Sequence, residues 1–271
     1  MKKFLPKLIL SLLMAAAFAP FSSEAQVGTS LNPSGYGDRT FDMDTVFSAK
    51  RIREDDKMYQ VAVWRRIDLR EKYNLSLYGS GDAKDNGIIS HIYKAVVDEN
   101  ALEVFADEDF TEPLSIAEFQ DNFWLNAIGD SIFVKQLYYL DFKEDFVFDK
   151  HHSDMVFDIK YIELVMPSQT NANAGQKTIA YIRYKDFYNY FKDHPEARWI
   201  NYKNIAKSLT YDEAFDARLF RSVVRRFTNP DEALIADLVD ADSPNPEVQA
   251  YINSLAFEYQ LLEYENTLWE W

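Results

Sequence analysis

The sequence predicts an α+β fold, with helices toward both ends of a single domain and a small, mostly antiparallel sheet at its centre. Near both ends, apolar residues recur at steps of three and four, which is the spacing of one helix face. In the middle, apolar and polar residues alternate, which is typical of half-buried strands. The chain is 47% hydrophobic and 15% aromatic. This composition supplies enough apolar surface for a packed core and argues against disorder.

The N-terminal half is predicted to be mainly helical. Its apolar residues follow the helical spacing over part of Asp44–Lys72, and Ser115 is a residue type preferred at helix N-caps. The expected elements, in chain order, are a helix within Asp44–Lys72, a loop over Asn74–Asn86, a helix over Gly87–Asn100, a short strand over Leu102–Phe105 and a helix that begins after Ser115.

The centre of the chain is dense in Val, Ile, Tyr and Phe and is predicted to form the sheet. Asn, Ala and Gly in Gln169–Gln176 indicate a turn, so the segments on either side should form a hairpin. Aromatic residues crowded in Phe187–Phe191 predict a helix that starts after Tyr184. The expected strands are Ser131–Leu140, Asp145–Asp149, Met155–Met166 and Thr178–Tyr184.

Two further helices are expected in the C-terminal part. Thr210 and Glu213 have the spacing of a capping box, which predicts a helix that ends near Arg226. Pro246 is suited to the first turn of a last helix that runs through Leu268. The apolar residues of this last helix that are spaced for one face are Ile252, Leu255, Tyr259, Leu262 and Trp269.

The first 25 residues are typical of a secretory signal peptide. Three lysines precede an uncharged apolar run over Leu8–Phe18, and Ser23-Glu24-Ala25 offers a small-x-small cleavage site before Gln26. The alternative is a membrane anchor, but the run of about eleven residues is well short of the ~20 that span a bilayer. No Cys stands at the cut to carry a lipid. We therefore expect residues 1–25 to be removed, residues 26–50 to form an extended arm, and no direct membrane insertion.

Charge excludes one class of function. The chain carries 29 Lys and Arg against 44 Asp and Glu, a net charge of −15, and removal of residues 1–25 leaves 26 against 43, a net charge of −17. Nucleic-acid binding depends on cations that displace counterions from phosphate, so no nucleic-acid partner is expected. The chain has no cysteine, which excludes a thiol nucleophile, a thiolate metal site and a redox pair.

Motifs for catalysis are absent from the sequence. It contains no phosphate-binding glycine loop, no G-x-S-x-G and no H-E-x-x-H. His151 and His152 could bind a metal only in a turn, where exposed polar residues are common for other reasons. The acidic runs Glu54–Asp56 and Asp107–Asp109 lack the pattern of a calcium loop, and we interpret them as solvated. No cofactor, metal or catalytic residue is predicted.

One segment contains residue types that are enriched in protein interfaces. Trp64, Arg65, Arg66 and Arg70 lie within seven residues, and Trp and Arg are frequent hot-spot residues. The hypothesis is that they bind a partner and lie partly at the surface; the alternative for Trp64 is a place in the core. Trp269 and Trp271 are aromatic residues at the other end that could also dock on a neighbour.

Several segments resemble one known family. The motifs are IREDD (52–56) with VWRRIDLREKYN (63–74), VFADEDFTEPLS (104–115), LTYDEAFDARLFRSVV (209–224) and the ending LLEYENTLWEW (261–271). Together they resemble the GldN/PorN family of gliding-motility and type IX secretion proteins. The resemblance assigns residues 51–271 to one GldN-like α+β domain.

The resemblance implies a non-enzymatic structural subunit. Such a subunit works in the periplasm and assembles into a large ring with a GldK/PorK-like outer-membrane lipoprotein, through which it is associated with the outer membrane. A GldM/PorM-like motor protein is a further expected partner. The alternative from the residues alone is a stand-alone exported hydrolase or ligand-binding protein that uses carboxylates or the His151/His152 pair.

Overall fold

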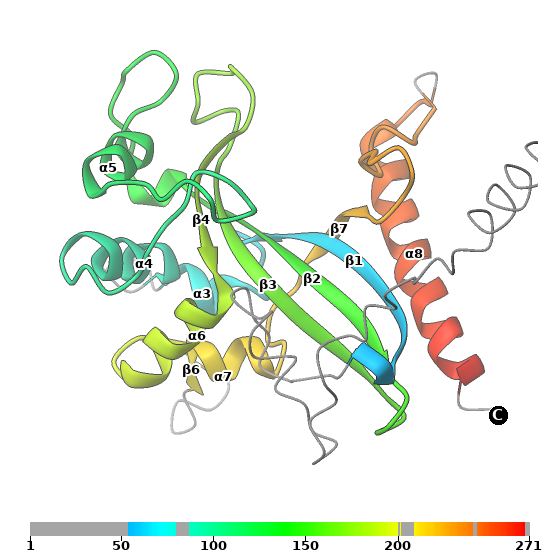
Figure 1. The fold of residues 1–271 in the computed structure, drawn as a ribbon. Helices are drawn as coiled ribbons and strands as arrows, with labels where there is room; N and C mark the ends of the chain where they lie inside the picture. Colours follow the sequence, from blue (N-terminus) through cyan, green and yellow to red (C-terminus); the bar gives the residue numbers. More distant parts are fainter. Residues whose placement is uncertain (1–53, 80–86, 200, 202–208, 241–242, 269–271) are drawn as a thin grey trace, which may run out of the picture.

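The computed structural model describes residues 54–79, 87–199, 201, 209–240 and 243–268. Their main feature is a five-stranded sheet in the order β4-β3-β2-β1-β7, in which every neighbouring pair is antiparallel (Figure 1). The α+β fold expected from the sequence is therefore confirmed. The strands are β1 (Lys57–Asp68), β2 (Tyr139–Asp149), β3 (Asp154–Met166), β4 (Lys177–Arg183) and β7 (Val223–Phe227).

Helices lie at both ends of this sheet. Figure 1 shows α3–α7 gathered at one end and α8 by itself beside β7 at the other. The helices are α3 (Leu75–Tyr78), α4 (Ile88–Val97), α5 (Ile116–Trp124), α6 (Tyr184–Asp193), α7 (Tyr211–Asp216) and α8 (Pro246–Leu268), with 3-10 turns η1 (Glu54–Asp56) and η2 (Val134–Gln136). A second, two-stranded sheet pairs β5 (Arg198–Trp199) with β6 (Leu209–Thr210).

The main hydrophobic core lies between one face of the sheet and helices α4–α7. Phe142 and Ile162 come from the sheet, while Phe119, Phe123 and Phe187 come from α5 and α6, and all five are fully buried. Two smaller clusters lie where α8 meets the same face, one around Phe146, Phe148, Met155 and Leu261 and one around Val63, Val224 and Ile235. One face of the sheet thus carries the apolar core, and its other face remains polar.

Sequence rules identified the helix starts well. Ser115 is the N-cap of α5, as expected, and it also forms a capping box with Glu118: the backbone N–H of Glu118 donates to Ser115 Oγ at 3.3 Å, and the N–H of Ser115 donates to Glu118 Oε2 at 3.0 Å. The capping box of Thr210 and Glu213 at α7 is also present. The expected helices after Gly87, after Tyr184 and from Pro246 are likewise confirmed as α4, α6 and α8.

The helix expected within Asp44–Lys72 is wrong over the described part, because Lys57–Asp68 is strand β1. The residues that β1 turns toward the core are Val63, Arg65 and Ile67, a period of two. Arg65 is a charged residue at a buried position, and this hid the alternation. The spacing of the remaining apolar residues then imitated a helix.

The helix expected to continue to Arg226 ends instead at Asp216. Arg218, two residues later, has a φ of 50°, and a left-handed residue just beyond a helix stops it. The segment then becomes β7, whose sequence VVRRF has the β-branched and aromatic residues typical of strands.

Three further expectations need correction. Ser131–Leu140 and Asp145–Asp149 are not two strands, because β2 runs without a break from Tyr139 to Asp149 and is preceded by the η2 turn. Leu102–Phe105 does not form a strand. Within this segment only Phe105 forms isolated β-bridges, one to Pro113 and one to Tyr181. Within the expected loop Asn74–Asn86, Leu75–Tyr78 form α3. The hairpin of β3 and β4 around Gln169–Gln176 is confirmed.

We predict that removing a core ring between sheet and helices destabilises the chain strongly. Phe187→Ala leaves a cavity at a fully buried site, and substitutions of this kind cost about 3–5 kcal/mol. The free energy of unfolding in urea measures the effect. Ile128→Ala is the matched control, because Ile128 is 69% exposed, and a loss as large as that of Phe187→Ala would contradict the assigned core.

Candidate functional site

Strand β1 places the side chains of Trp64, Arg65 and Arg66 on two faces of the sheet. Because side chains alternate along a strand, Arg65 points toward the helices, while Trp64 and Arg66 point toward the polar face. Arg65 is 7% exposed, and Trp64 and Arg66 are half-buried. The expectation that Arg65 lies at the surface is therefore wrong, whereas Trp64, Arg66 and the exposed Arg70 do reach it.

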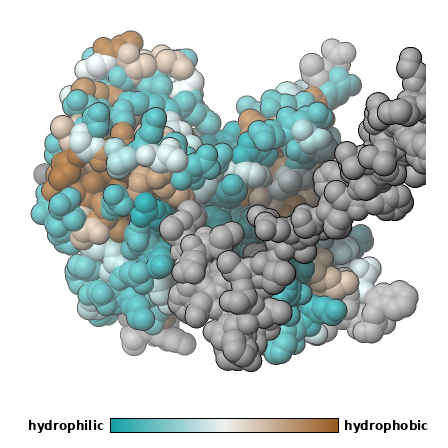
Figure 2. All heavy atoms as spheres, viewed as in Figure 1, coloured by the Kyte–Doolittle hydropathy of each residue, from teal (hydrophilic) through white to brown (hydrophobic). Residues whose placement is uncertain are grey.

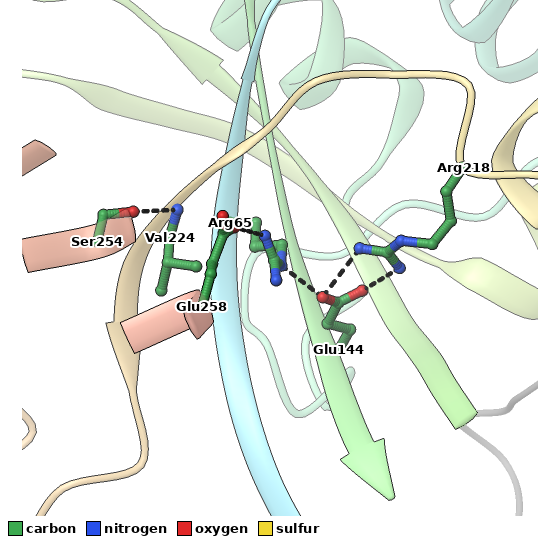
Figure 3. A network of polar contacts seen from close by, with 6 residues as sticks. All are labelled: Arg65, Glu144, Arg218, Val224, Ser254 and Glu258. Carbon is green, nitrogen blue, oxygen red and sulfur yellow. Dashed lines mark hydrogen bonds and ion pairs between the residues drawn. The ribbon is translucent and has the colours of Figure 1, made fainter. Parts of the chain in front are cut away.

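Arg65 belongs to a buried network of ions (Figure 3). Its Nε donates to Glu144 Oε1 at 2.5 Å, and Arg218 Nη1 donates to Glu144 Oε2 at 2.6 Å. Glu144 on β2 is fully buried, so its charge is compensated by two guanidinium groups from separate parts of the chain. A buried carboxylate requires such partners, because it has lost its hydration.

The same network attaches α8 to the sheet. Arg65 also donates to Glu258 of α8, and the N–H of Val224 on β7 donates to Ser254 Oγ at 3.0 Å (Figure 3). Glu258 and Ser254 are four residues apart and therefore lie on one helix face. This face of α8 is fixed by polar contacts as well as by the packing of Leu261.

The polar face of the sheet contains a cleft of about 310 Å³. It is lined by residues of all five strands together with Glu108, Gln176 and Leu234 from loops. The residues that bring a charge or an aromatic ring to it are Trp64, Arg66, Glu108, Asp141, Tyr161, Glu163, Tyr181, Arg225 and Arg226. Arg65 also borders the cleft, but its guanidinium group is paired with Glu144 on the opposite face. Figure 2 shows mainly hydrophilic residues on the described part of the molecule, with apolar ones gathered near α4 and α5.

Trp64 lies between two cations in this cleft. The guanidinium carbon of Arg226 is 3.7 Å from the centre of the Trp64 ring, and Lys143 Nζ is 4.9 Å from it. The indole N–H donates to the hydroxyl of Tyr161 at 3.1 Å, and this hydroxyl donates to Glu108 at 2.7 Å. The ring is therefore held in place with an edge open to solvent rather than buried in the core.

Arg66 forms the other side of the cleft. It binds Asp141 through two parallel hydrogen bonds of 2.6 Å and donates to the side-chain oxygen of Gln176 at 2.9 Å. Arg225 donates to the same oxygen at 3.2 Å. Within the described residues, neither Arg225 nor Arg226 forms an ion pair with a carboxylate. The cleft thus offers two guanidinium groups that can still pair with an anion.

Glu163 has an unusual charge state. Burial, and then the nearby charge of Asp141, raise its pKa to about 7, although a hydrogen bond from Thr178 at 2.6 Å and the charge of Arg66 act in the other direction. Burial and the nearby Arg66 also lower the pKa of Arg225. Near neutral pH, Glu163 is close to half-protonated and neutralises the cleft cations only in part.

The other candidate residues lie outside the cleft. Arg70 pairs with Asp68 at 2.7 Å and lies over the ring of Tyr138 at 3.6 Å. His151 and His152 lie in the turn between β2 and β3 and are exposed, as predicted from the sequence. His152 Nδ1 is 2.5 Å from Asp149 Oδ2. Trp269 and Trp271 lie outside the described residues.

The acidic runs have structural contacts. Asp107 accepts hydrogen bonds from the backbone N–H groups of Thr111 and Glu112 and so shapes the turn before α5. Its pKa is lowered chiefly by a hydrogen bond from the hydroxyl of Thr111. Asp55 and Asp56 have contacts of their own. Among the described residues, no group of three or more His, Asp and Glu side chains is arranged to hold a metal ion.

Sequence reasoning missed Asp141, Glu163, Arg225 and Arg226 as site residues. Arg225 and Arg226 fell inside a segment taken for a helix, although VVRRF could have been recognised as a strand. Asp141 and Glu163 pair across β2 and β3, and no pattern within either strand indicates that both face Arg66. What the cleft brings together is cations, an aromatic ring and a titratable carboxylate, which suits recognition of a charged partner.

The fold and the cleft define a class: α+β proteins whose antiparallel sheet is covered by helices on one face and presents charged and aromatic residues on the other. The chain matches the family model of the gliding motility associated protein GldN over residues 52–270. It belongs to the GldN family. No match was found among curated proteins. None of the helices in the described ranges is long and apolar enough to cross a membrane.

We predict that the buried network is required for stability. Glu144→Gln leaves Arg65 and Arg218 without their shared carboxylate, and breaking a buried ion pair in this way costs about 3–5 kcal/mol. Chemical denaturation measures the loss. Arg70→Gln removes an exposed ion pair and serves as the control, with an expected loss of about 1 kcal/mol or less; equal losses would show that the network contributes no more than a surface pair.

The raised pKa of Glu163 predicts a pH effect on stability. Between the unfolded value of 4.5 and the folded value of about 7, the folded chain binds more protons, so the contribution of Glu163 is lost as the pH rises through this window. In Glu163→Gln the side chain stays neutral. The stability of this variant relative to the unmodified chain should therefore rise by up to about 3 kcal/mol from pH 4.5 to pH 7.5.

Unfolding curves at several pH values test this prediction. Asp109→Asn is the control, since it removes an exposed carboxylate outside the cleft lining. A stability difference between Glu163→Gln and the unmodified chain that does not change with pH would contradict the assigned charge state.

Proposed function

We propose that the chain is an exported, non-enzymatic structural subunit of the type IX secretion and gliding motility machinery. Its membership of the GldN family over residues 52–270 supports the assignment to this machinery. The signal-like first 25 residues support export to the periplasm. The observation that carries a binding role is the arrangement of Trp64 and Arg226 at the cleft, with Arg225 beside them.

The proposed partner is a GldK/PorK-like outer-membrane lipoprotein. The subunit docks through the cleft, and carboxylates of the partner pair with Arg225 and Arg226, which have no such partner among the described residues of their own chain. Exposed edges of Trp64 add apolar contact area, as aromatic hot-spot residues do. Repetition of this contact builds a ring that is held at the outer membrane by the lipoprotein and is coupled to a GldM/PorM-like motor protein.

The arrangement of the described residues gives less support to the alternative, an exported hydrolase or ligand-binding protein. The His151/His152 pair follows the end of β2, ten residues along the chain from Asp141 in the cleft. At about 3.3 Å per residue, the eight steps of β2 from Asp141 to Asp149 span roughly 26 Å, so the pair and the cleft do not form one site. The cleft carboxylates Asp141, Glu163 and Glu108 accept hydrogen bonds from Arg66, Thr178 and Tyr161 respectively.

We predict that changes at the cleft weaken assembly without unfolding the chain. Trp64→Ala and Arg226→Glu should each reduce co-purification with the co-expressed lipoprotein by at least about tenfold, which corresponds to the loss of one hot-spot contact. The amount of lipoprotein recovered on the tagged chain and the mass of the complex are the readouts. Thermal melting of the isolated variants verifies that they fold.

Arg198→Ala is the control, because Arg198 is exposed and lies outside the cleft. It should leave recovery of the lipoprotein unchanged. A chain that stays monomeric with the lipoprotein present would overturn the proposal, as would folded cleft variants that assemble normally.

A further inference from the structure

Helix α8 carries an apolar stripe on the side away from the sheet. The stripe is defined as Val248, Ile252, Leu255, Tyr259 and Leu262, which follow one another at steps of four, three, four and three. With 3.6 residues per turn they lie within roughly 80° of one another around the helix. Leu255 is half-buried, and Val248, Ile252, Tyr259 and Leu262 are 56%, 48%, 68% and 52% exposed.

The opposite side of α8 is the side that packs on its own domain. Ser254, Phe257, Glu258 and Leu261 contact the sheet, and their mean direction is roughly 130° from the stripe at 100° per residue. The expectation that the spacing of Ile252, Leu255, Tyr259 and Leu262 marks one helix face is thus correct, but this face is not the packed one.

The helix cannot rotate to bury the stripe without breaking its polar contacts. Rotation would separate Glu258 from the buried Arg65 and Ser254 from the N–H of Val224. Arg65 and the N–H of Val224 are buried groups, and leaving them without a hydrogen-bond partner is unfavourable. The stripe is therefore presented outward by the same contacts that fix the inner face.

The charge of α8 indicates what can cover the stripe. The helix contains four glutamates and no Lys, Arg or His. Glu263 lies next to the stripe on one side, and Glu247 and Glu265 lie toward the other side. A second copy of α8 would bring only further carboxylates to this surface, and like charges across an interface are repulsive. A partner with cations beside its apolar residues is complementary.

We propose that the stripe on α8 docks an amphipathic helix of a partner protein that carries Lys and Arg beside its apolar residues. Apolar residues spaced by three and four on each helix interlock, as in other helix pairs. From Val248 to Leu262 the stripe extends about 21 Å, which matches four turns of a partner helix. This surface is separate from the cleft at Trp64, so either proposal can fail while the other stands.

Binding of designed peptides to the full chain tests the charge requirement. The probe is a 21-residue helical peptide with Leu at the a and d positions and Lys at the e and g positions, measured by fluorescence anisotropy at 150 mM salt. One comparison peptide has Glu at e and g, and another has the Leu and Lys residues in scrambled order. The Lys peptide should bind at least tenfold more tightly than either; equal binding of the Glu peptide would overturn the proposal.

Variants that do not alter charge test the location. Ile252→Ser/Tyr259→Ser/Leu262→Ser should weaken binding of the Lys peptide at least tenfold. Gln249→Ser/Ala256→Ser/Gln260→Ser changes three exposed residues of the same helix outside the stripe and should change binding less than twofold. Circular dichroism verifies that both triple variants keep α8. Unchanged binding to the stripe variant would show that the peptide is held elsewhere by charge alone, and would overturn the proposal.

A photo-cross-linker in cells identifies the natural occupant. With p-benzoylphenylalanine in place of Tyr259, the cross-linked peptide should come from another protein and should contain apolar residues at steps of three and four with an excess of Lys and Arg. The same group in place of Gln260 is the control. A cross-link to a second copy, to residues 26–50 of the same chain or to lipid would overturn the proposal in favour of that occupant.

Discussion

The buried carboxylate of Glu144 is the interaction on which the arrangement of the other parts depends. It lies at 0% exposure in the middle of the sheet and is paired with Arg65 and Arg218. Arg65 in turn reaches Glu258, so one chain of charges connects β2, β1, the segment after α7 and α8. The pairing must offset the solvation that the buried ions have lost, and removing one member is costly because it leaves a buried charge unpaired. Here the network determines which side of β1 and of α8 faces inward.

The inward positions of Arg65 and Glu258 determine which residues lie on the two outer surfaces that we propose for partner binding. With Arg65 inward, strand alternation turns Trp64 and Arg66 outward into the cleft, where they meet Arg226 and Asp141. With Glu258 inward, helix geometry turns the stripe on α8 outward. The two surfaces differ in chemistry: the cleft presents cations and an aromatic ring, and the stripe presents apolar side chains bordered by carboxylates. The two proposals therefore assign partners of different charge to the two surfaces.

Local sequence signals predicted much of the fold. The N-cap residue Ser115 and the capping box of Thr210 and Glu213 identified helix starts, because the contacts that such signals need lie within four residues. The alternation of apolar and polar residues identified β3 and β4, because it too is a pattern of residues that are neighbours in the chain. The errors at β1 and β7 arose where a charged residue occupies a buried or strand position. The site was harder: the Trp and Arg content indicated the region around Trp64, but nothing local separated the buried Arg65 from its exposed neighbours.

The sequence by itself determined the class of fold, most helix starts, the hairpin of β3 and β4, and the membership of the GldN family that its motifs suggested. Tertiary structure alone decided which residues meet: Arg65 and Glu144 are 79 residues apart, and Arg65 and Glu258 are 193 apart. It also decided that the apolar stripe on α8 faces outward. The physical reason is that backbone patterns are local, whereas the compensation of a buried charge depends on groups that only the folded chain brings together.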